Sequence, residues 1–264
     1  MVAPATLRMY QIDAFADRIF SGNPAAVCPL ETWLPDATLQ AIAAENNLPA
    51  TAFFAPEGSG YRLRWFTPVT ELELCGHGTL ASADVVFRVL RCAETSISFI
   101  TRSGTLTVVH ENGVYAMDFP ATTPAPCPVS PAIVEGLGVV PVETLRGFDH
   151  VVVLDTEAEI RALRPIFSAW ADLDLRGVCV TAPGDHVDFV SRFFLLRHAA
   201  PEDPATGSTH CELTPYWAKR LNKTSLRALQ VSPRGGAMSC DLHGDRVIIR
   251  GRAAHYMTAD IMVG

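Results

Sequence analysis

The fold of this chain is decided by the stretch from Glu73 to Phe87, which reads ELCGHGTLASADVVF. The pattern predicts a strand over residues 72–75, a tight glycine turn, and then a helix of small residues that continues to about Leu90. Apolar residues lie on more than one face of this helix, which indicates that it is buried. A buried helix that begins at a bare, glycine-rich turn is typical of the floor of an active site.

The glycine turn predicts a site for an anion. Gly76 and Gly78 allow another group to approach the backbone closely, or the chain to adopt a positive φ without steric cost. The free N–H groups of Gly78 and Thr79 point out of the first helical turn, where the helix dipole is positive. We therefore expect this turn to bind part of a small anionic substrate.

The second half of the chain contains a similar turn. The stretch from Glu202 to His210 reads EDPATGSTH; it follows an apolar strand over residues 192–196 and opens a helix over residues 211–221. Two such units in one chain suggest two similar domains that face each other. Sliding one turn over the other places Cys75 on Pro204, His77 on Thr206, Gly78 on Gly207 and Thr79 on Ser208.

The composition narrows the class of protein. The chain has 264 residues, of which 48% are apolar and 19% charged, which suits two ordinary domains with a sizeable core. A net charge of -7 argues against a nucleic-acid partner, which requires clustered Lys and Arg. The apolar runs are too short to span a bilayer, and the N-terminus lacks a signal-peptide pattern, so we expect no membrane association. The seven cysteines form no CxxC pair and are expected to be reduced thiols of a cytoplasmic protein.

The order of strands, turns and helices predicts an α+β fold in two domains. Hairpin signals such as Asn112-Gly113 favour largely antiparallel sheets, and each half of the chain has several strands around one apolar helix. The proline-rich stretch over residues 121–131 is the predicted linker. We therefore expect one domain over residues 1–120 and a second over residues 121–264, with a last strand that can return to the first domain.

Glu45 is the first candidate for acid–base chemistry. It is predicted to lie near the C-terminal end of a helix that has Asp36 as its N-cap. The helix dipole disfavours a negative charge at that end, and Glu45 shares a face with Ile42, which suggests partial desolvation. Both effects favour use of the carboxyl group as a general acid/base. The alternative is an ordinary exposed glutamate on a helix.

Cys75 and His77 invite three interpretations. A metal site is not expected, because Cys-x-His lacks the spacing of zinc pairs and no second pair completes it. A thiol at a helix start is chemically suited to act as a nucleophile, and His77 is suited to polarise a substrate carbonyl. The alternative is that both are structural residues of the turn.

Asp203 and Ser208 flank the second turn. One interpretation is a capping motif, in which Asp203 accepts backbone N–H groups and Thr206 or Ser208 is the N-cap. The functional interpretation is that Asp203 and Glu45 are carboxylates on opposite domains that flank one cleft.

Taken together, these stretches resemble the PhzF-like family, the phenazine-biosynthesis isomerases within the diaminopimelate epimerase fold. Each match is short, but their order and spacing make the set specific. The matching stretches are YQIDAF (10–15), FSGNPAAV (20–27), AENNL (44–48), LRWFTP (63–68), ELCGHGT (73–79) and EDPATGS (202–208).

The resemblance implies two domains, each a barrel-like sheet around a central helix, with the active site between them. It also implies a homodimer that uses neither metal nor organic cofactor, and a proton shift within a small carboxylate substrate. The family's catalytic glutamate falls on Glu45, and its supporting residues fall on His77, Asp203 and Ser208. The substrate-binding residues are then expected to be Asn23, Cys75, Gly76, Gly78, Thr79 and Gly207.

Departures from the family pattern leave alternatives open. Glu45 is followed by Asn-Asn-Leu-Pro-Ala where family members usually carry a more Ser/Thr-rich run, so the substrate can differ. A racemase or epimerase that uses Glu45 and Cys75 is one alternative. A Cys/Cys racemase is not expected, because Pro204 stands where the second thiol is needed. The third possibility is a non-catalytic protein that binds small acids.

Overall fold

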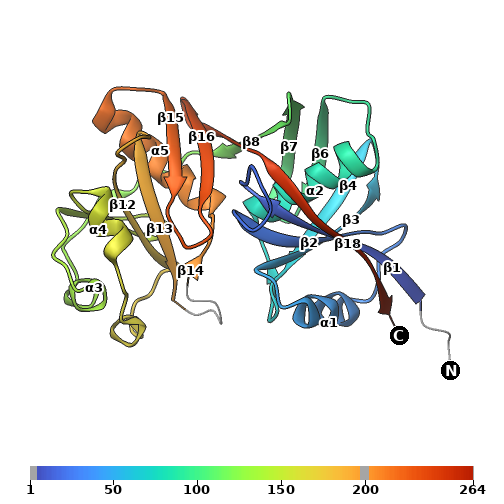
Figure 1. Ribbon diagram of the computed structural model, residues 1–264, viewed down its shortest axis with the longest axis horizontal. Coiled ribbons are helices and arrows are strands. Elements are labelled where there is room, and N and C mark those ends of the chain that lie inside the picture. The colour runs from blue at the N-terminus through green and yellow to red at the C-terminus, as the bar shows by residue number, and fades with distance from the viewer. Residues whose placement is uncertain (1–4, 197–201, 264) are drawn as a thin grey trace. The chain divides into compact units, whose positions relative to one another are not determined.

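The computed structural model describes residues 5–196 and 202–263. The chain divides into two compact units, which are considered one at a time (Figure 1). Unit 1 comprises Met1–Asp118 and Arg250–Gly264, and unit 2 comprises Phe119–Ile249. The C-terminal strand therefore belongs to the same unit as the N-terminal strand.

Unit 1 is a mostly antiparallel sheet with two helices. Along the sheet, the strands run in the order β18, β1, β2, β3, β4, β6, β7 and β8, and the short β5 pairs with β4. Among these pairs, β2–β3 and β4–β6 are parallel. The elements are β1 (Ala5–Ala14), β2 (Asn23–Pro29), α1 (Asp36–Asn46), β3 (Ala50–Glu57), β4 (Gly60–Phe66), β5 (Glu71–Leu72), α2 (Gly76–Asp84), the π-helical η1 (Val85–Val89), β6 (Ser96–Thr101), β7 (Gly104–Glu111), β8 (Val114–Pro120) and β18 (Ala253–Val263).

Helix α2 is the centre of unit 1. Every residue from Gly76 to Asp84 is buried, and the helix contacts β1, β2, β3 and β18. Small residues allow this close approach: a Cβ atom at Gly251, just before β18, would lie 2.5 Å from Phe15 and 3.2 Å from Leu80. The buried helix predicted from the sequence is therefore confirmed.

Helix α1 covers the other face of the sheet. Its buried side chains, Leu39, Ile42 and Ala43, pack in one cluster with Cys28 and Phe53 of the adjacent parallel strands. Strands β2 and β3 are consequently buried on both faces, which explains their near-continuous apolar sequences.

Unit 2 has the same kind of sheet. Its strands run in the order β9, β10, β11, β12, β13, β15 and β16, with the short β14 beside β13. The pairs β11–β12 and β13–β15 are parallel. The elements are β9 (Ala125–Pro126), α3 (Pro131–Leu137), β10 (Glu143–Arg146), β11 (His150–Val153), α4 (Glu157–Ala162), the 3₁₀ turn η2 (Phe167–Trp170), β12 (Gly177–Pro183), β13 (Phe189–Leu195), β14 (Glu202–Asp203), α5 (Gly207–Leu221), β15 (Ser225–Gln230), β16 (Gly236–His243) and β17 (Arg246–Gly251).

The two units repeat one topology. The succession β3–β4–β5–α2–β6 has the same pairings as β12–β13–β14–α5–β15. In unit 1, α2 lies between the parallel strands β4 and β6, and in unit 2, α5 lies between the parallel strands β13 and β15. A partly buried arginine–glutamate clamp also recurs: Arg64 binds Glu71 through two hydrogen bonds of 2.8 Å, and Arg192 binds Glu202 at 2.7 and 2.8 Å. The expected α+β fold of two similar parts, largely antiparallel, is confirmed.

Several local predictions need correction. The strand expected over residues 72–75 is instead the two-residue Glu71–Leu72, because Cys75 is already the N-cap of α2. Pro35, not Asp36, is the N-cap of α1, and it makes no side-chain cap bond. The predicted linker over residues 121–131 contains β9, which pairs with β10 inside unit 2.

The alignment of the two turns is also corrected. Short strand and helix start are spaced alike in both units, so Glu71 corresponds to Glu202 and Cys75 to Thr206, an offset of 131 residues instead of 129. His77 therefore corresponds to Ser208. The residue that matches Cys75 is a threonine rather than Pro204, and the second thiol is still missing.

Candidate active site

The first turn, residues 75–79, is held by its own side chains. The Cys75 Sγ accepts the Gly78 N–H at 3.3 Å, and the Thr79 hydroxyl donates to the Cys75 carbonyl at 2.7 Å. A Cβ atom at Gly78 would lie 2.7 Å from Trp65 and 3.0 Å from the Cys75 Sγ. Glycine is required here by close packing rather than by a positive φ, because Gly78 is absent from the positive-φ glycines.

The Cys75 thiol and the His77 imidazole touch. The Sγ lies 3.5 Å from the Nδ1 and 3.7 Å from the Nε2 of His77, and both side chains are buried. The two residues expected to do chemistry at this turn are therefore brought together. The thiol is also the N-cap of α2, so it has a structural role whatever its chemical one.

Strand pairing brings Glu45 to the same edge of the sheet as the first turn. Strand β3 begins just after α1 ends, and Thr51 pairs with Phe66 at the end of β4, from which the chain leads to the turn. The Gln40 amide donates to the Thr67 carbonyl at 2.9 Å, and the Asn46 amide donates to the Thr51 hydroxyl at 3.2 Å. The first bond joins α1 to the chain that enters the turn, and the second joins the last residue of α1 to β3.

Asn23 lies at this edge as well, because it begins β2, which runs parallel to β3. Its side chain is buried. Glu45, in contrast, is exposed, so the expectation that it is partly desolvated is wrong. Helix α1 packs through Leu39, Ile42 and Ala43, and it ends one residue after Glu45, beyond that contact face.

The second turn, residues 203–208, is built differently. Thr206 is the N-cap of α5, but its hydroxyl donates to Asp203 Oδ2 at 2.5 Å instead of capping the helix. Gln230 braces the turn: its Oε1 accepts the Thr206 N–H at 2.8 Å, and its Nε2 donates to the Asp203 carbonyl at 2.6 Å. The carboxylate of Asp203 is thus fixed in a largely buried position.

Ser208 is hydrogen-bonded to an ion pair that sequence reasoning missed, formed by the buried Asp149 and the partly exposed Arg176. Arg176 Nη1 donates to the Ser208 hydroxyl at 2.7 Å, while its Nε and Nη2 donate to the two carboxylate oxygens of Asp149 at 3.0 and 2.6 Å. Asp149 is fully buried. The Asp149 carboxylate raises the pKa of Arg176, and the nearby Glu212 and Asp203 act in the same direction against the effect of burial.

Glu212 completes this cluster. It lies four residues after Ser208, hence on the same face of α5. Burial raises the pKa of Glu212 to about 7, and the charge of Asp149 adds to the rise. Its Oε1 accepts the Phe148 N–H at 2.5 Å, while its buried Oε2 meets no partner among the described residues.

A family model described as "Phenazine biosynthesis-like protein" (PhzC-PhzF) matches residues 12–259. The chain belongs to this family. A protein of Pseudomonas aeruginosa named an uncharacterized isomerase is 51% identical over 97% of this chain and 98% of its own length. A second uncharacterized isomerase, from Halalkalibacterium halodurans, is 41% identical over 98% of this chain and 99% of its own length. The chain is accordingly an isomerase of the PhzF family.

Solved structures agree with this assignment. A PhzF-family protein of Enterococcus faecalis superposes with a TM-score of 0.95 at 47% identity, over 97% of this chain and 99% of its own. A hydroxyproline epimerase of Agrobacterium vitis shares the fold alone, with a TM-score of 0.63 at 10% identity over 98% of this chain and 93% of its own. The expected epimerase-like fold is therefore confirmed.

The family motifs in the sequence identify site residues that lie in or beside the two glycine turns. Arg176 and Asp149 stand outside every motif of the PhzF pattern, so no local signal pointed to them. Glu212 had one weak signal, an acidic side chain at the sixth position of a mostly buried helix.

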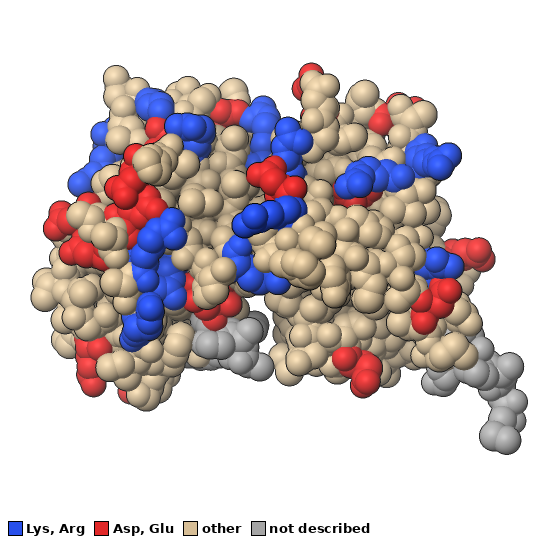
Figure 2. Space-filling model, in the orientation of Figure 1, with Lys and Arg blue, Asp and Glu red and all other residues tan. Residues whose placement is uncertain are grey.

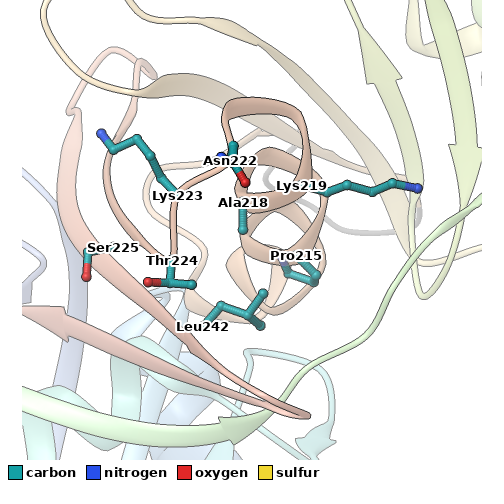
Figure 3. A pocket seen from close by; sticks show the side chains of 8 residues that line it. All are labelled: Pro215, Ala218, Lys219, Asn222, Lys223, Thr224, Ser225 and Leu242. Atoms are coloured by element: carbon teal, nitrogen blue, oxygen red, sulfur yellow. The ribbon is translucent and has the colours of Figure 1, made fainter.

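Other features of this PhzF protein lie away from the turns. An open groove is lined by Pro215, Ala218, Lys219, Asn222, Lys223, Thr224, Ser225 and Leu242 (Figure 3). It lies at the C-terminal end of α5, whereas Ser208 lies at the N-terminal end, so the groove is not part of the predicted site.

Basic and acidic side chains are interspersed on the visible face of each unit (Figure 2). Within residues 5–196 and 202–263, no helix is long and apolar enough to span a bilayer.

Proposed function

We propose that this PhzF-family isomerase moves a proton within a small cyclic or amino-acid-like carboxylate, with Glu45 as the general acid/base. One observation carries the proposal: the strand register of unit 1 supports a position for Glu45 and the first turn at a common edge of one sheet. The exposed carboxylate of Glu45 is free to reach a substrate and to exchange its proton with water.

In the proposed reaction, Glu45 removes a proton from a carbon atom of the substrate. The electron pair delocalises toward an adjacent unsaturated group, and Glu45 returns the proton to another carbon of the same molecule. His77 polarises the group that receives the developing charge, while Asp203 and Ser208 bind polar groups of the substrate. Asn23, Gly76, Gly78, Thr79 and Gly207 remain the predicted binding residues, and a cofactor-free homodimer remains the predicted form.

Deuterium incorporation tests this proposal. The protein is incubated in D2O with dihydroanthranilate-type substrates, and double-bond migration and deuterium uptake are followed by NMR. Glu45→Gln is expected to slow turnover by about 10²–10⁴-fold, the usual contribution of a general acid/base. The matched control is Glu135→Gln, which changes another exposed helix glutamate and leaves turnover intact. Undiminished turnover by the Glu45→Gln protein would remove this residue from the chemistry.

The position of Cys75 beside His77 favours a second candidate, a racemase or epimerase that uses Glu45 and Cys75 as opposed bases. Deuterium uptake at Cα with inversion, abolished by Cys75→Ser, supports it over double-bond migration. Because Thr206 stands at the corresponding cap of α5, a two-thiol mechanism is not proposed. Tight binding of small acids without turnover of any of them identifies a binding protein instead.

A further inference from the structure

The proposed proton shift gives the Cys75 thiol no chemical step, although the structure surrounds it with groups that activate sulfur. The Nδ1 of His77 lies 3.5 Å from the Sγ, within reach of the thiol proton. The Gly78 N–H donates to the Sγ at 3.3 Å, at the positive end of α2, where a negative charge is stabilised. Both features favour the thiolate, which is the nucleophilic form of cysteine.

An unpaired donor borders the same sulfur. The Nε1–H of Trp65 is buried and meets no acceptor in the part of the chain that the structure describes. A Cβ atom built on Gly78 would lie 3.0 Å from the Cys75 Sγ and 3.2 Å from the Trp65 Nε1, so both groups flank one small space. An indole nitrogen only donates and a thiol sulfur accepts weakly. An oxygen atom bonded to the Sγ would therefore give this N–H the acceptor that it lacks.

We propose that Cys75 is a modification site for hydrogen peroxide, which converts its thiol to a sulfenic acid that accepts a hydrogen bond from Trp65. Access selects an oxidant of this size, because Cys75 is only 5% exposed and His77 only 8% exposed. An opening of this kind admits a molecule of two oxygen atoms, whereas a bulky disulfide such as oxidised glutathione is too large to reach the sulfur. The inference goes beyond the proposed function, because the modification requires no turnover.

The step is a two-electron oxidation of sulfur. The Cys75 proton moves to His77, and the thiolate attacks one oxygen of the peroxide. The S–O bond forms as the O–O bond breaks, and the leaving hydroxide takes the proton from His77 and becomes water. The thiol and hydrogen peroxide thereby give the sulfenic acid and water. The new oxygen lies at the turn where substrate is expected to bind, so oxidation is expected to stop turnover until dithiothreitol restores the thiol; this consequence alone rests on the proposed function.

Peptide mass spectrometry after a pulse of hydrogen peroxide tests the inference. The folded chain is oxidised, catalase ends the reaction, and urea with excess dimedone then unfolds the chain and traps sulfenic acids. Trypsin separates Cys75, in the peptide 65–88, from Cys92, in the peptide 92–102. Cys92 is the internal control, because it is more exposed than Cys75 and the described residues record no imidazole beside it. Cys75 is expected to be oxidised about tenfold faster than Cys92 in spite of its burial.

Two variants test the parts of the site. His77→Gln is expected to slow the oxidation of Cys75 about tenfold and to leave the rate at Cys92 unchanged. Trp65→Phe keeps an aromatic ring but removes the N–H, so less of the oxidised Cys75 is expected as sulfenic acid and more as sulfinic acid. Trp170→Phe is the matched control, because it removes a buried indole N–H of unit 2 that likewise meets no partner among the described residues.

Oxidation of Cys92 at least as fast as that of Cys75 overturns the inference, as does an unchanged rate at Cys75 in His77→Gln. Equal yields of sulfenic acid from wild type and Trp65→Phe overturn the role given to the indole. These measurements need no substrate. A chain that forms the Cys75 sulfenic acid but isomerises nothing contradicts the proposed function alone, whereas a chain that isomerises its substrate but whose Cys75 resists peroxide contradicts this inference alone.

Discussion

The two units share a scaffold and differ in what it carries. In each, an arginine–glutamate clamp joins the short strand before the turn to its neighbouring strand. The arginine also lies over a phenylalanine of its own strand, Phe66 in unit 1 and Phe194 in unit 2. Each clamp fixes where the next helix begins. The chemistry placed at that helix start is nevertheless different: a thiol and an imidazole in unit 1, and in unit 2 a hydroxyl that accepts a hydrogen bond from Arg176.

Strand register shows why an arginine lies beside the turn in unit 2 but not in unit 1. Thr51 pairs with Phe66, and Val178 pairs with Phe194, so these residues occupy equivalent positions and Pro49 corresponds to Arg176. At this position unit 2 supplies a guanidinium group to its turn, whereas unit 1 has a proline that follows the end of the helix bearing Glu45. The same edge of the scaffold therefore provides a carboxylate in one unit and a cation in the other.

The largest expected effect is on the Asp149–Arg176 pair of unit 2, in which the aspartate is fully buried. Asp149→Ala removes a fully buried carboxylate and the two hydrogen bonds that it accepts from Arg176, which should lower the free energy of unfolding by about 3 kcal/mol. Urea denaturation measures the change. Asp174→Ala, which breaks the exposed pair with Arg146, is the control and should leave the free energy of unfolding nearly unchanged. Equal losses would mean that burial does not distinguish the two pairs.

The next effect is a pH dependence of stability that unit 2 contributes through Glu212. Its folded-state pKa of about 7 lies above the 4.5 of a free glutamate, so the folded chain retains this proton where the unfolded chain loses it. The stabilisation is fully present below pH 4.5 and is lost as the pH rises through about 7. Between these values we expect a fall of about 2 kcal/mol that Glu212→Gln abolishes.

Thermal unfolding of both proteins between pH 4.5 and 8 measures this slope, with Glu135→Gln as the exposed control. Parallel curves for wild type and Glu212→Gln would show that the buried carboxyl group does not titrate in this window.

The smallest effect compares the two caps. Cys75→Ser preserves an acceptor for the Gly78 N–H and should change stability by less than about 0.5 kcal/mol, since serine is a favourable N-cap. Thr206→Val removes a hydroxyl that donates to Asp203 Oδ2 and should cost about 1–2 kcal/mol. Chemical denaturation measures the free energy of unfolding of both variants. A larger loss for Cys75→Ser than for Thr206→Val would contradict the expected difference between the two caps.

The sequence by itself determined the fold class, the family, the two glycine turns and the helices that follow them. These depend on short-range signals, namely strand alternation, turn residues and helix caps, which lie within a few positions of one another. The same signals assigned Glu45 to the end of its helix, but they did not predict its exposure, because that depends on which face of α1 packs against the sheet.

Only the tertiary structure decided the register of the repeat and the partners of Ser208. The offset of 131 residues between the turns follows from how β5 and β14 pair with their neighbours, which no local alignment contains. Asp149, Arg176 and Ser208 are separated by 27 and 32 residues and meet because β11, β12 and α5 pack together. Hydrogen bonds over such separations form once the strands are in register, so the sequence encodes them only through the fold as a whole.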